Sequence, residues 1–205
     1  ERLGTVTFDG SGNQILTNTF GETFYNMTVN KPGGALTLNN NATVSGINPG
    51  TLTMTKGNID ASIGKLILGD ACGNQGTLAY TSGSIIGRFE RWINTTSPTV
   101  FLFPVGTSSF YRPANITFNV LSPCGSLITE FVATSPGKTG LPLSEAPLSP
   151  ADSVRNTFAE GYWAVTSGNG LASSDYNMEC TGNGFTSFPI NAVTMLLTRA
   201  NAGSS

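Results

Sequence analysis

Histidine is absent from the 205-residue chain. Its absence removes the commonest general base, the histidine-dependent serine and cysteine nucleophiles, and every histidine-ligated metal site. Charged residues are scarce as well, at 11%, and the net charge is −2. The ten lysines and arginines are scattered, so the sequence has no basic stretch of the kind that binds nucleic acid. We expect no catalytic residues, no cofactor and no nucleic-acid partner.

Long apolar runs are missing too. None approaches the roughly 20 residues that span a bilayer, so we expect no membrane insertion. Apolar residues nevertheless make up 39% of the chain, which is enough to build a core and argues against disorder.

Cysteine is limited to Cys72, Cys124 and Cys180, which are widely spaced and form no C-x-x-C motif. This spacing does not suit a metal site. In an exported protein, one disulfide and one free thiol are expected. We predict a bond between Cys124 and Cys180, since both lie in the second half of the chain. Three free thiols are the alternative.

Short segments with alternating apolar residues recur between residues 5 and 86, about seven or eight residues apart. Examples are TVTF, MTVN, ALTL, TLTMT and KLILG. Three such segments per coil of about 22 residues predict a short parallel β-solenoid, in which inward aliphatic side chains stack in ladders. A sandwich of hairpins is the alternative, although the hairpin dipeptide Asn-Gly does not occur in this half.

The repeat also predicts which residues stack. Val6 is expected to lie over Val29, and Val29 over Leu52, each one coil further along the chain. The other predicted ladder partners are Leu52 with Leu78, Leu36 with Ile59, and Val44 with Leu66.

From about Arg88 the segments become longer and more aromatic, and none has a helical period. About seven strands of this kind predict an Ig-like antiparallel β-sandwich. We therefore expect two domains, a solenoid over residues 1–87 and a sandwich over residues 88–205. Residues 135–152 are rich in proline and are expected to form a long surface loop.

The stretch FLFPVGTSSFYRP, residues 101–113, is unusual for two strands and a turn. Pro104 ends the first strand because it has no N–H to donate to a ladder, and Gly106 permits the turn. A structural corner is expected, and a ligand site is the alternative. The corner residues are Pro104, Gly106, Tyr111, Arg112 and Pro113.

Side chains of this stretch have expected roles as well. Phe110 and Tyr111 are placed to cover the seam between solenoid and sandwich. Arg112, held extended by the proline that follows it, is expected to pair with Glu90 or to donate to loop carbonyls.

Three stretches together resemble a known module: LTMTKGNIDASIGKLILG, GSIIGRFERWI and FLFPVGTSSFYRPANITF. The module occurs in very large secreted surface proteins of Bacteroidota-type bacteria, which are often exported by the type IX secretion route. GYWAVT and LTRANAGSS extend the resemblance over nearly the whole chain, and the FPVG and YRP elements are its most specific part. The resemblance implies a structural or adhesive role at the cell surface.

Parallel β-helices also host polysaccharide lyases and hydrolases, which need clustered carboxylates or a base beside them. The candidate residues are Asp60, Asp70, Lys56 and Lys65. Because Asp60 and Asp70 are not one coil apart, we expect solvated turn residues and not an active site.

Two further motifs are weak. DGSGN offers Asp9, Ser11 and Asn13 to calcium but lacks the glycine and the acidic residue that later positions of a calcium loop require. The tripeptide starting at Asp152 resembles the Bacteroidota O-glycosylation motif. Ser153 is expected to be exposed in the proline-rich loop and is therefore a candidate for O-glycosylation.

We predict a non-enzymatic extracellular structural protein, a cell-surface or filament-forming subunit that assembles through β-edges. Its partners would be copies of itself, head to tail, or adjacent modules of a longer chain. A carbohydrate-binding or adhesive module is the second hypothesis, since Trp92, Tyr162 and Trp163 can form a platform for sugar rings or belong to the core. A glycan-active β-helix enzyme is the third.

Overall fold

A computed structural model describes residues 3–46, 50–94, 99–143, 153–192 and 194–198. Strands account for most of the regular structure of these ranges, and helix is absent from them. Accordingly, the described residues include no helix that is long and apolar enough to cross a membrane. The predicted all-β class is confirmed, with a parallel solenoid of about four turns and a separate antiparallel sheet.

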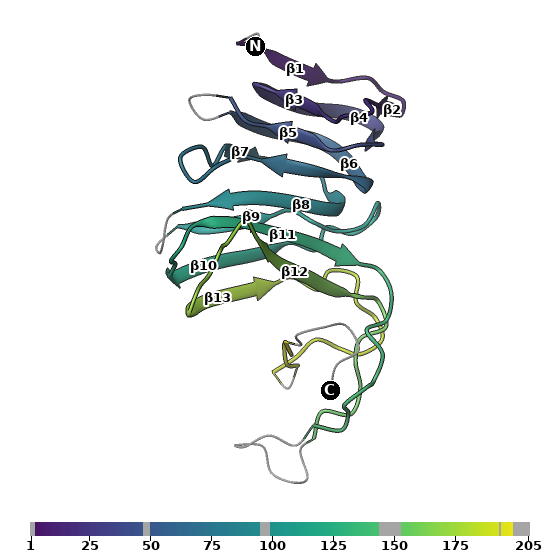
Figure 1. The fold of residues 1–205 in the computed structure, drawn as a ribbon. Coiled ribbons are helices and arrows are strands. Elements are labelled where there is room, and N and C mark those ends of the chain that lie inside the picture. Colours follow the sequence, from purple (N-terminus) through teal and green to yellow (C-terminus); the bar gives the residue numbers. More distant parts are fainter. Residues whose placement is uncertain (1–2, 47–49, 95–98, 144–152, 193, 199–205) are drawn as a thin grey trace. The chain divides into compact units, whose positions relative to one another are not determined.

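The solenoid is built from strands that pair in parallel with the strand one coil further along (Figure 1). Long strands bend across two or three faces of the coil, so that β4 pairs with both β1 and β2. β6 pairs with β4, β5, β7 and β8. The strands are β1 (Thr5–Phe8), β2 (Gln14–Leu16), β3 (Glu22–Phe24), β4 (Asn26–Leu38), β5 (Ala42–Val44), β6 (Thr51–Leu68), β7 (Thr77–Tyr80) and β8 (Ile85–Ile93).

The predicted ladders are partly right. Leu52 lies over Leu78 and Leu36 over Ile59, as expected. The other predicted pairs are wrong, each by a slip of two positions, so that Val6 pairs with Met27 and not with Val29. The corrected partners are Met27 for Leu52, Met54 for Val29, Ala42 for Leu66 and Leu68 for Val44.

The error arises because the coils differ in length. Along the first ladder, the step from Val6 to Met27 is shorter than the step from Met27 to Leu52. A two-residue slip keeps every side chain on its face, since side chains alternate with a period of two. The sequence pattern therefore identified the inward residues correctly but not all of their partners.

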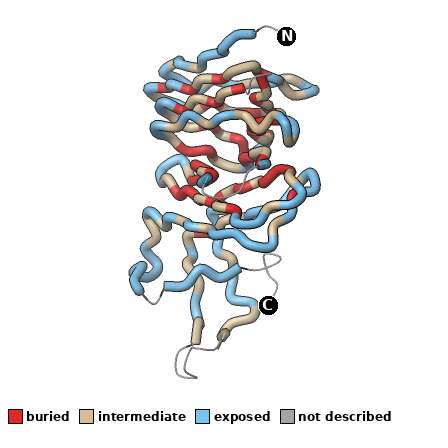
Figure 2. The backbone as a smooth tube through the Cα atoms, turned by 90° about the vertical axis from the view of Figure 1, so that its left-hand side faces the viewer, coloured by how far each residue is buried: buried red, intermediate tan, exposed pale blue. Residues whose placement is uncertain are grey.

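The core consists of these inward residues, which are fully buried in the middle coils (Figure 2). Alternation along each strand puts them inside and turns threonine and asparagine toward the outside. The buried ladder residues include Met27, Val29, Leu36, Leu38, Val44, Leu52, Met54, Ile59, Leu66, Leu68 and Ile85.

Antiparallel pairing begins at β8. This strand pairs in parallel with β6 and antiparallel with β11, so it runs through the boundary expected between residues 87 and 88. β12 follows β11 in the same sheet, while β13, β10 and β9 form a second, antiparallel sheet. The bounds are β9 (Val100–Phe103), β10 (Ala114–Val120), β11 (Gly125–Val132), β12 (Tyr162–Gly168) and β13 (Asp175–Cys180).

The chain divides into two compact units. The first contains residues 1–131 and 163–181, and the second contains residues 132–162 and 182–205. The second unit holds the proline-rich segment, in which a bridge joins Leu143 to Val154, and residues 144–152 lie outside the described ranges. One of the seven strands expected after Arg88 was AVTMLLTR, residues 192–199, but the described residues 194–198 are not in a strand.

Candidate functional site

The stretch FLFPVGTSSFYRP folds into a tight turn, residues 105–112, which we call the corner hairpin. Its ends are joined by a hydrogen bond from the Arg112 N–H to the Val105 carbonyl, at 2.9 Å, and by a bridge between Gly106 and Tyr111. Thr107 Oγ1 accepts hydrogen bonds from the backbone inside the turn. A Cβ on Gly106 would lie 2.2 Å from the Phe110 carbonyl oxygen, so only glycine fits there.

The corner hairpin continues one face of the solenoid. Ile85 N–H donates to the Pro104 carbonyl at 2.8 Å, and Gly106 N–H donates to the Ile85 carbonyl at 3.1 Å. Val105 thereby pairs in parallel with Ile85 and is itself buried. Pro104 precedes the paired residue, where its missing N–H costs no hydrogen bond.

Arg112 is nearly buried, with 3% of its surface exposed. Its guanidinium carbon lies 4.5 Å from the ring centre of Phe131 and 5.0 Å from that of Phe110. Its carbonyl accepts a 2.8 Å hydrogen bond from Trp163 Nε1. The anticipated pair with Glu90 does not form, because Glu90 pairs with Lys65 and accepts from Asn169.

A second arginine has a similar environment that the sequence did not reveal. Arg91 lies between the rings of Phe101 and Phe103 and donates to the Leu102 carbonyl at 2.8 Å. Burial lowers the pKa of Arg91 to about 10. The alternation of β8 gives the signal in hindsight, since Arg91 stands between the inward residues Phe89 and Ile93.

A groove opens between the corner hairpin and the turn that joins β7 to β8. It has a volume of about 450 Å³. The rings of Tyr80 and Tyr111 stack in it with centres 5.6 Å apart and an interplanar angle of 13°. The residues that line this corner groove are Asn58, Tyr80–Ser84 and Thr107–Tyr111.

The corner groove carries no charge at neutral pH. None of its lining residues is an acid, a lysine or an arginine. Burial raises the pKa of Tyr80. Burial raises the pKa of Tyr111 as well, so both phenols stay neutral. Hydrogen bonding and ring stacking are therefore the interactions that this groove offers.

The first coil, residues 5–24, differs from the coils that follow it. Each of its strands pairs with one neighbour only, so its other edge is unpaired among the described residues. Val6, at an inward position, is 44% exposed, whereas its partner Met27 is fully buried. Large apolar side chains are exposed on or beside this coil, namely Leu3, Val6, Ile15 and Phe20.

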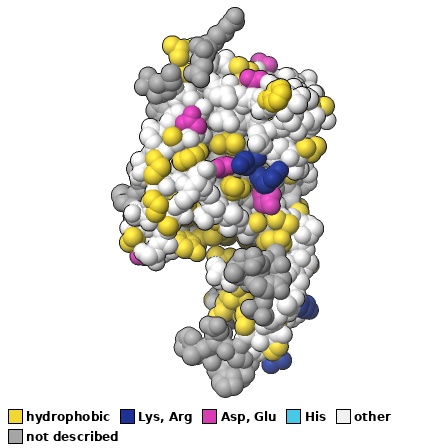
Figure 3. Space-filling view, viewed as in Figure 1, with side chains coloured by type: hydrophobic (Ala, Val, Ile, Leu, Met, Phe, Trp, Pro, Cys, Tyr) yellow, Lys and Arg dark blue, Asp and Glu magenta, His cyan; other side chains and the backbone are white. Residues whose placement is uncertain are grey.

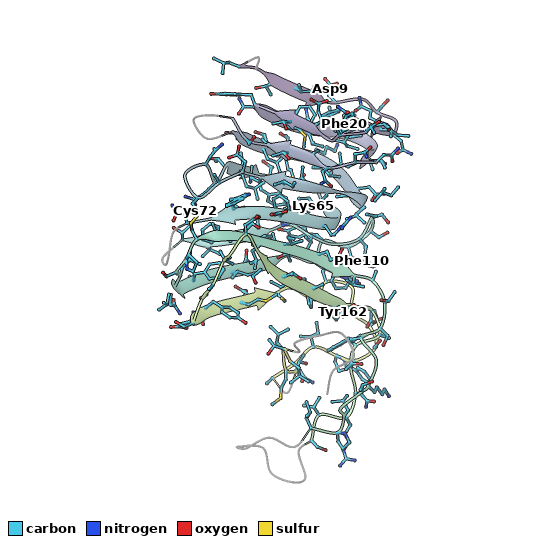
Figure 4. The ribbon with its side chains drawn as sticks, viewed as in Figure 1. Asp9, Phe20, Lys65, Cys72, Phe110 and Tyr162 are labelled. Carbon is cyan, nitrogen blue, oxygen red and sulfur yellow. A yellow bond between two sulfur atoms is a disulfide. The ribbon has the colours of Figure 1, made fainter. Side chains whose placement is uncertain are left out.

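The weak calcium motif lies in this coil, where Figure 4 labels Asp9 and Phe20. Oxygen atoms of the loop at Gly10 to Gln14 accept hydrogen bonds from the ammonium group of a lysine. Lys31 Nζ donates to the carbonyls of Gly10 and Gly12 and to Gln14 Oε1, each at 2.8 Å. Lys31 is 1% exposed, and these three acceptors match its three N–H groups.

The calcium candidates themselves do not converge. Asn13 Oδ1 accepts from the Ala35 N–H at 3.0 Å, and Asp9 and Ser11 are exposed. Within the described ranges, no three acidic or thiol side chains gather in a way that could hold a metal ion.

The predicted disulfide is wrong. Cys124 bonds to Cys72, with Cα atoms 5.9 Å apart, and Cys180 is free. Cys180 pairs with Ala114 at the start of β10, whereas Cys124 follows the end of that strand. The length of β10, about 20 Å, therefore separates Cys180 from the strand end that Cys124 follows, whereas the Cα atoms of a disulfide lie within roughly 7 Å. Burial raises the pKa of the Cys180 thiol to about 12.

Three of the four candidate acids and bases of a glycan-active enzyme form hydrogen bonds or an ion pair with other residues of the chain. Asp60 accepts from the N–H and the hydroxyl of Ser62, and Asp70 accepts from Asn74. Lys65 pairs with Glu90, and Lys56 is exposed. Charged side chains are few on the face in Figure 3, and each of the two aspartates accepts from a residue close to it in the chain.

The remaining sequence candidates are Ser153 and the aromatic side chains that were expected to form a sugar platform or to belong to the core. Ser153 was expected to be exposed, but its hydroxyl oxygen is buried. Trp163 packs edge-on against Phe131, with ring centres 5.2 Å apart. Trp92, on β8, lies opposite Ser126 of β11, and Trp163 is on β12, so the two tryptophans belong to different strands.

No family model, curated protein or solved structure matches the chain.

Proposed function

We propose that the chain is a non-enzymatic structural module of an extracellular protein, and that it joins a further β-structure through its first coil. The observation that carries this proposal is the contrast between the first coil and the second. Four ladder positions that are fully buried in the second coil are exposed or half-buried in the first, at Val6, Phe8, Gln14 and Leu16, whereas Phe24 is buried. The outer strand edges of the first coil are unpaired among the described residues.

The unpaired strand edges and the exposed apolar residues both favour a further β-coil as the partner. Unpaired parallel strands offer a row of N–H and C=O groups that another strand satisfies. Exposed apolar ladder residues gain free energy when another coil covers them. A further coil supplies both at once, whether it belongs to a second copy or to another segment of the same polypeptide.

The opposite end of the solenoid is covered, and this restricts the geometry of assembly. β11 pairs with β8, and the corner hairpin pairs with Ile85. Two first coils meeting each other would close into a dimer, whereas a filament needs a first coil to meet a different edge, such as β12 or β13. We propose the head-to-tail contact of a surface or filament subunit.

An extracellular setting is supported by the bond between Cys72 and Cys124. Disulfides persist in oxidising compartments and are rare in the cytosol. The resemblance to secreted surface modules of Bacteroidota-type bacteria, and export by the type IX route with it, belongs to the same proposal.

Sedimentation and electron microscopy of the native material test assembly. Filaments that disappear on Val6→Lys, with an unchanged circular dichroism spectrum, support the head-to-tail contact. Closed dimers would support the first-coil surface but contradict the filament. A particle with the mass of a single chain at high concentration would refute self-assembly, and a far heavier single polypeptide on a denaturing gel would show that adjacent modules supply the partner.

A further inference from the structure

Beyond its structural role, the molecule has a surface suited to a small ligand. The corner groove, at about 450 Å³, falls within the roughly 300–1,000 Å³ of typical ligand sites. Its two walls come from segments that are bonded to each other. Asn58 links them, because its Nδ2 donates to the Ser108 carbonyl and its Oδ1 accepts from the Ser84 N–H.

Aromatic surface lies inside the groove. Phe110, labelled in Figure 4, is 40% exposed, and the Arg112 guanidinium lies 5.0 Å from its ring centre. Tyr80 is fixed as well, since its hydroxyl donates to the Gly83 carbonyl at 2.8 Å and its ring stacks on Tyr111. Aromatic rings held in this way lose little entropy when a ligand packs on them.

Hydroxyl groups stand beside these rings. Ser82 donates to the Thr55 carbonyl, and Thr107 accepts from the turn, so these two are used within the protein. Thr81, Ser108 and Ser109 are exposed and make no side-chain hydrogen bond among the described residues. They come from both walls and remain available to a ligand.

We propose that the corner groove binds a neutral oligosaccharide. The apolar face of a sugar ring packs on Phe110, and ring hydroxyls bond to the free hydroxyls of Thr81, Ser108 and Ser109. An anionic ligand finds no lysine or arginine in the lining, and a purely apolar ligand would leave the wall hydroxyls without partners. This site uses none of the tryptophans that the sequence suggested, and it is independent of the first coil.

The test is a titration followed by amide NMR. The probes are neutral hexasaccharides of glucose, mannose, galactose and N-acetylglucosamine, with oligogalacturonate as the charged comparison. The expected result is saturable shifts of the amides of residues 81–84 and 107–111 with at least one neutral probe. Phe110→Ala is expected to weaken binding about tenfold, and Phe110→Trp to preserve it.

Phe20→Ala is the matched control, because it removes the same side chain from an exposed position on the first coil. It is expected to leave the affinity unchanged. If Phe110→Ala does not fold, Ser108→Arg fills the groove from an exposed position and is expected to abolish binding. The proposal is overturned if none of the neutral probes binds saturably, if oligogalacturonate binds in preference, or if both groove variants bind as the wild type does.

Discussion

The middle coils of the solenoid and the second compact unit are stabilised in different ways. In the coils, ladder residues such as Leu52 and Ile59 are completely buried. In the second unit, none of the described large apolar residues is buried, and Phe188, Ile190, Met195, Leu196 and Leu197 are exposed. Apolar burial therefore stabilises the first region far more than the second.

The second unit relies on polar contacts and a small aromatic cluster. Phe158 contacts Phe185 and Phe188, with ring centres 5.1 and 5.7 Å away. Glu160 accepts hydrogen bonds from the backbone of Thr186 and Ser187, each at 2.6 Å. Since exposed hydrogen bonds contribute little net free energy, this unit should open more readily than the coils do.

The largest expected effect is that of Leu52→Ala. It removes a fully buried side chain from a ladder between Met27 and Leu78 and leaves a cavity. The free energy of unfolding should fall by roughly 2–5 kcal/mol. Leu196→Ala, at a residue that is 53% exposed, should cost less than about 0.5 kcal/mol.

Urea unfolding of both variants measures this contrast. Equal losses would mean either that the coils are not the stable region or that Leu196 is covered in solution.

The disulfide should contribute nearly as much to the free energy of unfolding as the Leu52 side chain does. The bond between Cys72 and Cys124 joins residues that are 52 apart in sequence, and loops of this size typically gain about 2–4 kcal/mol. The double variant Cys72→Ala/Cys124→Ala should therefore lower the denaturant midpoint of the first unit, measured without reductant. Cys180→Ala, at the free cysteine, is the control and should cost less. Reductant should lower the denaturant midpoint of the Cys180→Ala protein, which keeps the disulfide, more than the midpoint of the double variant, which lacks it. Equal changes in the two proteins would mean that the pairing is wrong.

Lys31→Met should have an intermediate effect. Methionine keeps much of the length of the side chain but leaves three oxygens of the loop at Gly10 to Gln14 without their donor. The loss should be about 1–3 kcal/mol, because the bonds that are removed involve a charged donor in a buried position. Lys56→Met, at an exposed lysine of the same solenoid, should change stability little. Thermal unfolding that does not separate these two variants would show that Lys31 is not needed there.

Local patterns predicted the fold well and the long-range contacts poorly. Alternation in TLTMT and KLILG identified inward residues, because it depends only on the period of a strand. Partners depend on coil length, and no local signal announces that the coil from Val6 to Met27 is shorter than the coil from Met27 to Leu52.

The same limit applies to the sites. Pro104 and Gly106 have local reasons to form a turn, so the corner was predictable. The stacking of Tyr80 on Tyr111 and the bond between Cys72 and Cys124 join residues that are distant in the chain. Local sequence patterns do not show which distant residues come together in the fold. The corner groove, which is lined by two such segments, could therefore not be predicted from them.

The smallest expected effect is one of pH, and it concerns Glu160 of the second unit. Although partial burial acts to raise the pKa of Glu160, hydrogen bonds from Thr186 and Ser187 outweigh it and lower that pKa to about 2. An unfolded glutamate titrates near pH 4.3. Because the folded pKa lies below the unfolded one, Glu160 stabilises this segment above about pH 4.5, and the contribution is lost as the pH falls from there to about 2.

Amide hydrogen exchange at Thr186 and Ser187 measures this effect between pH 6 and pH 2, after correction for the intrinsic exchange rate. Their protection should fall over this range, while the amides of β6 keep theirs. Glu160→Gln should lower protection at both residues at pH 6 and remove most of the dependence on pH, because an amide oxygen accepts more weakly than a carboxylate. If protection in the wild type is constant down to pH 2, or if Glu160→Gln shows the same decline, another group holds this segment and the contrast with the coils must be explained without Glu160.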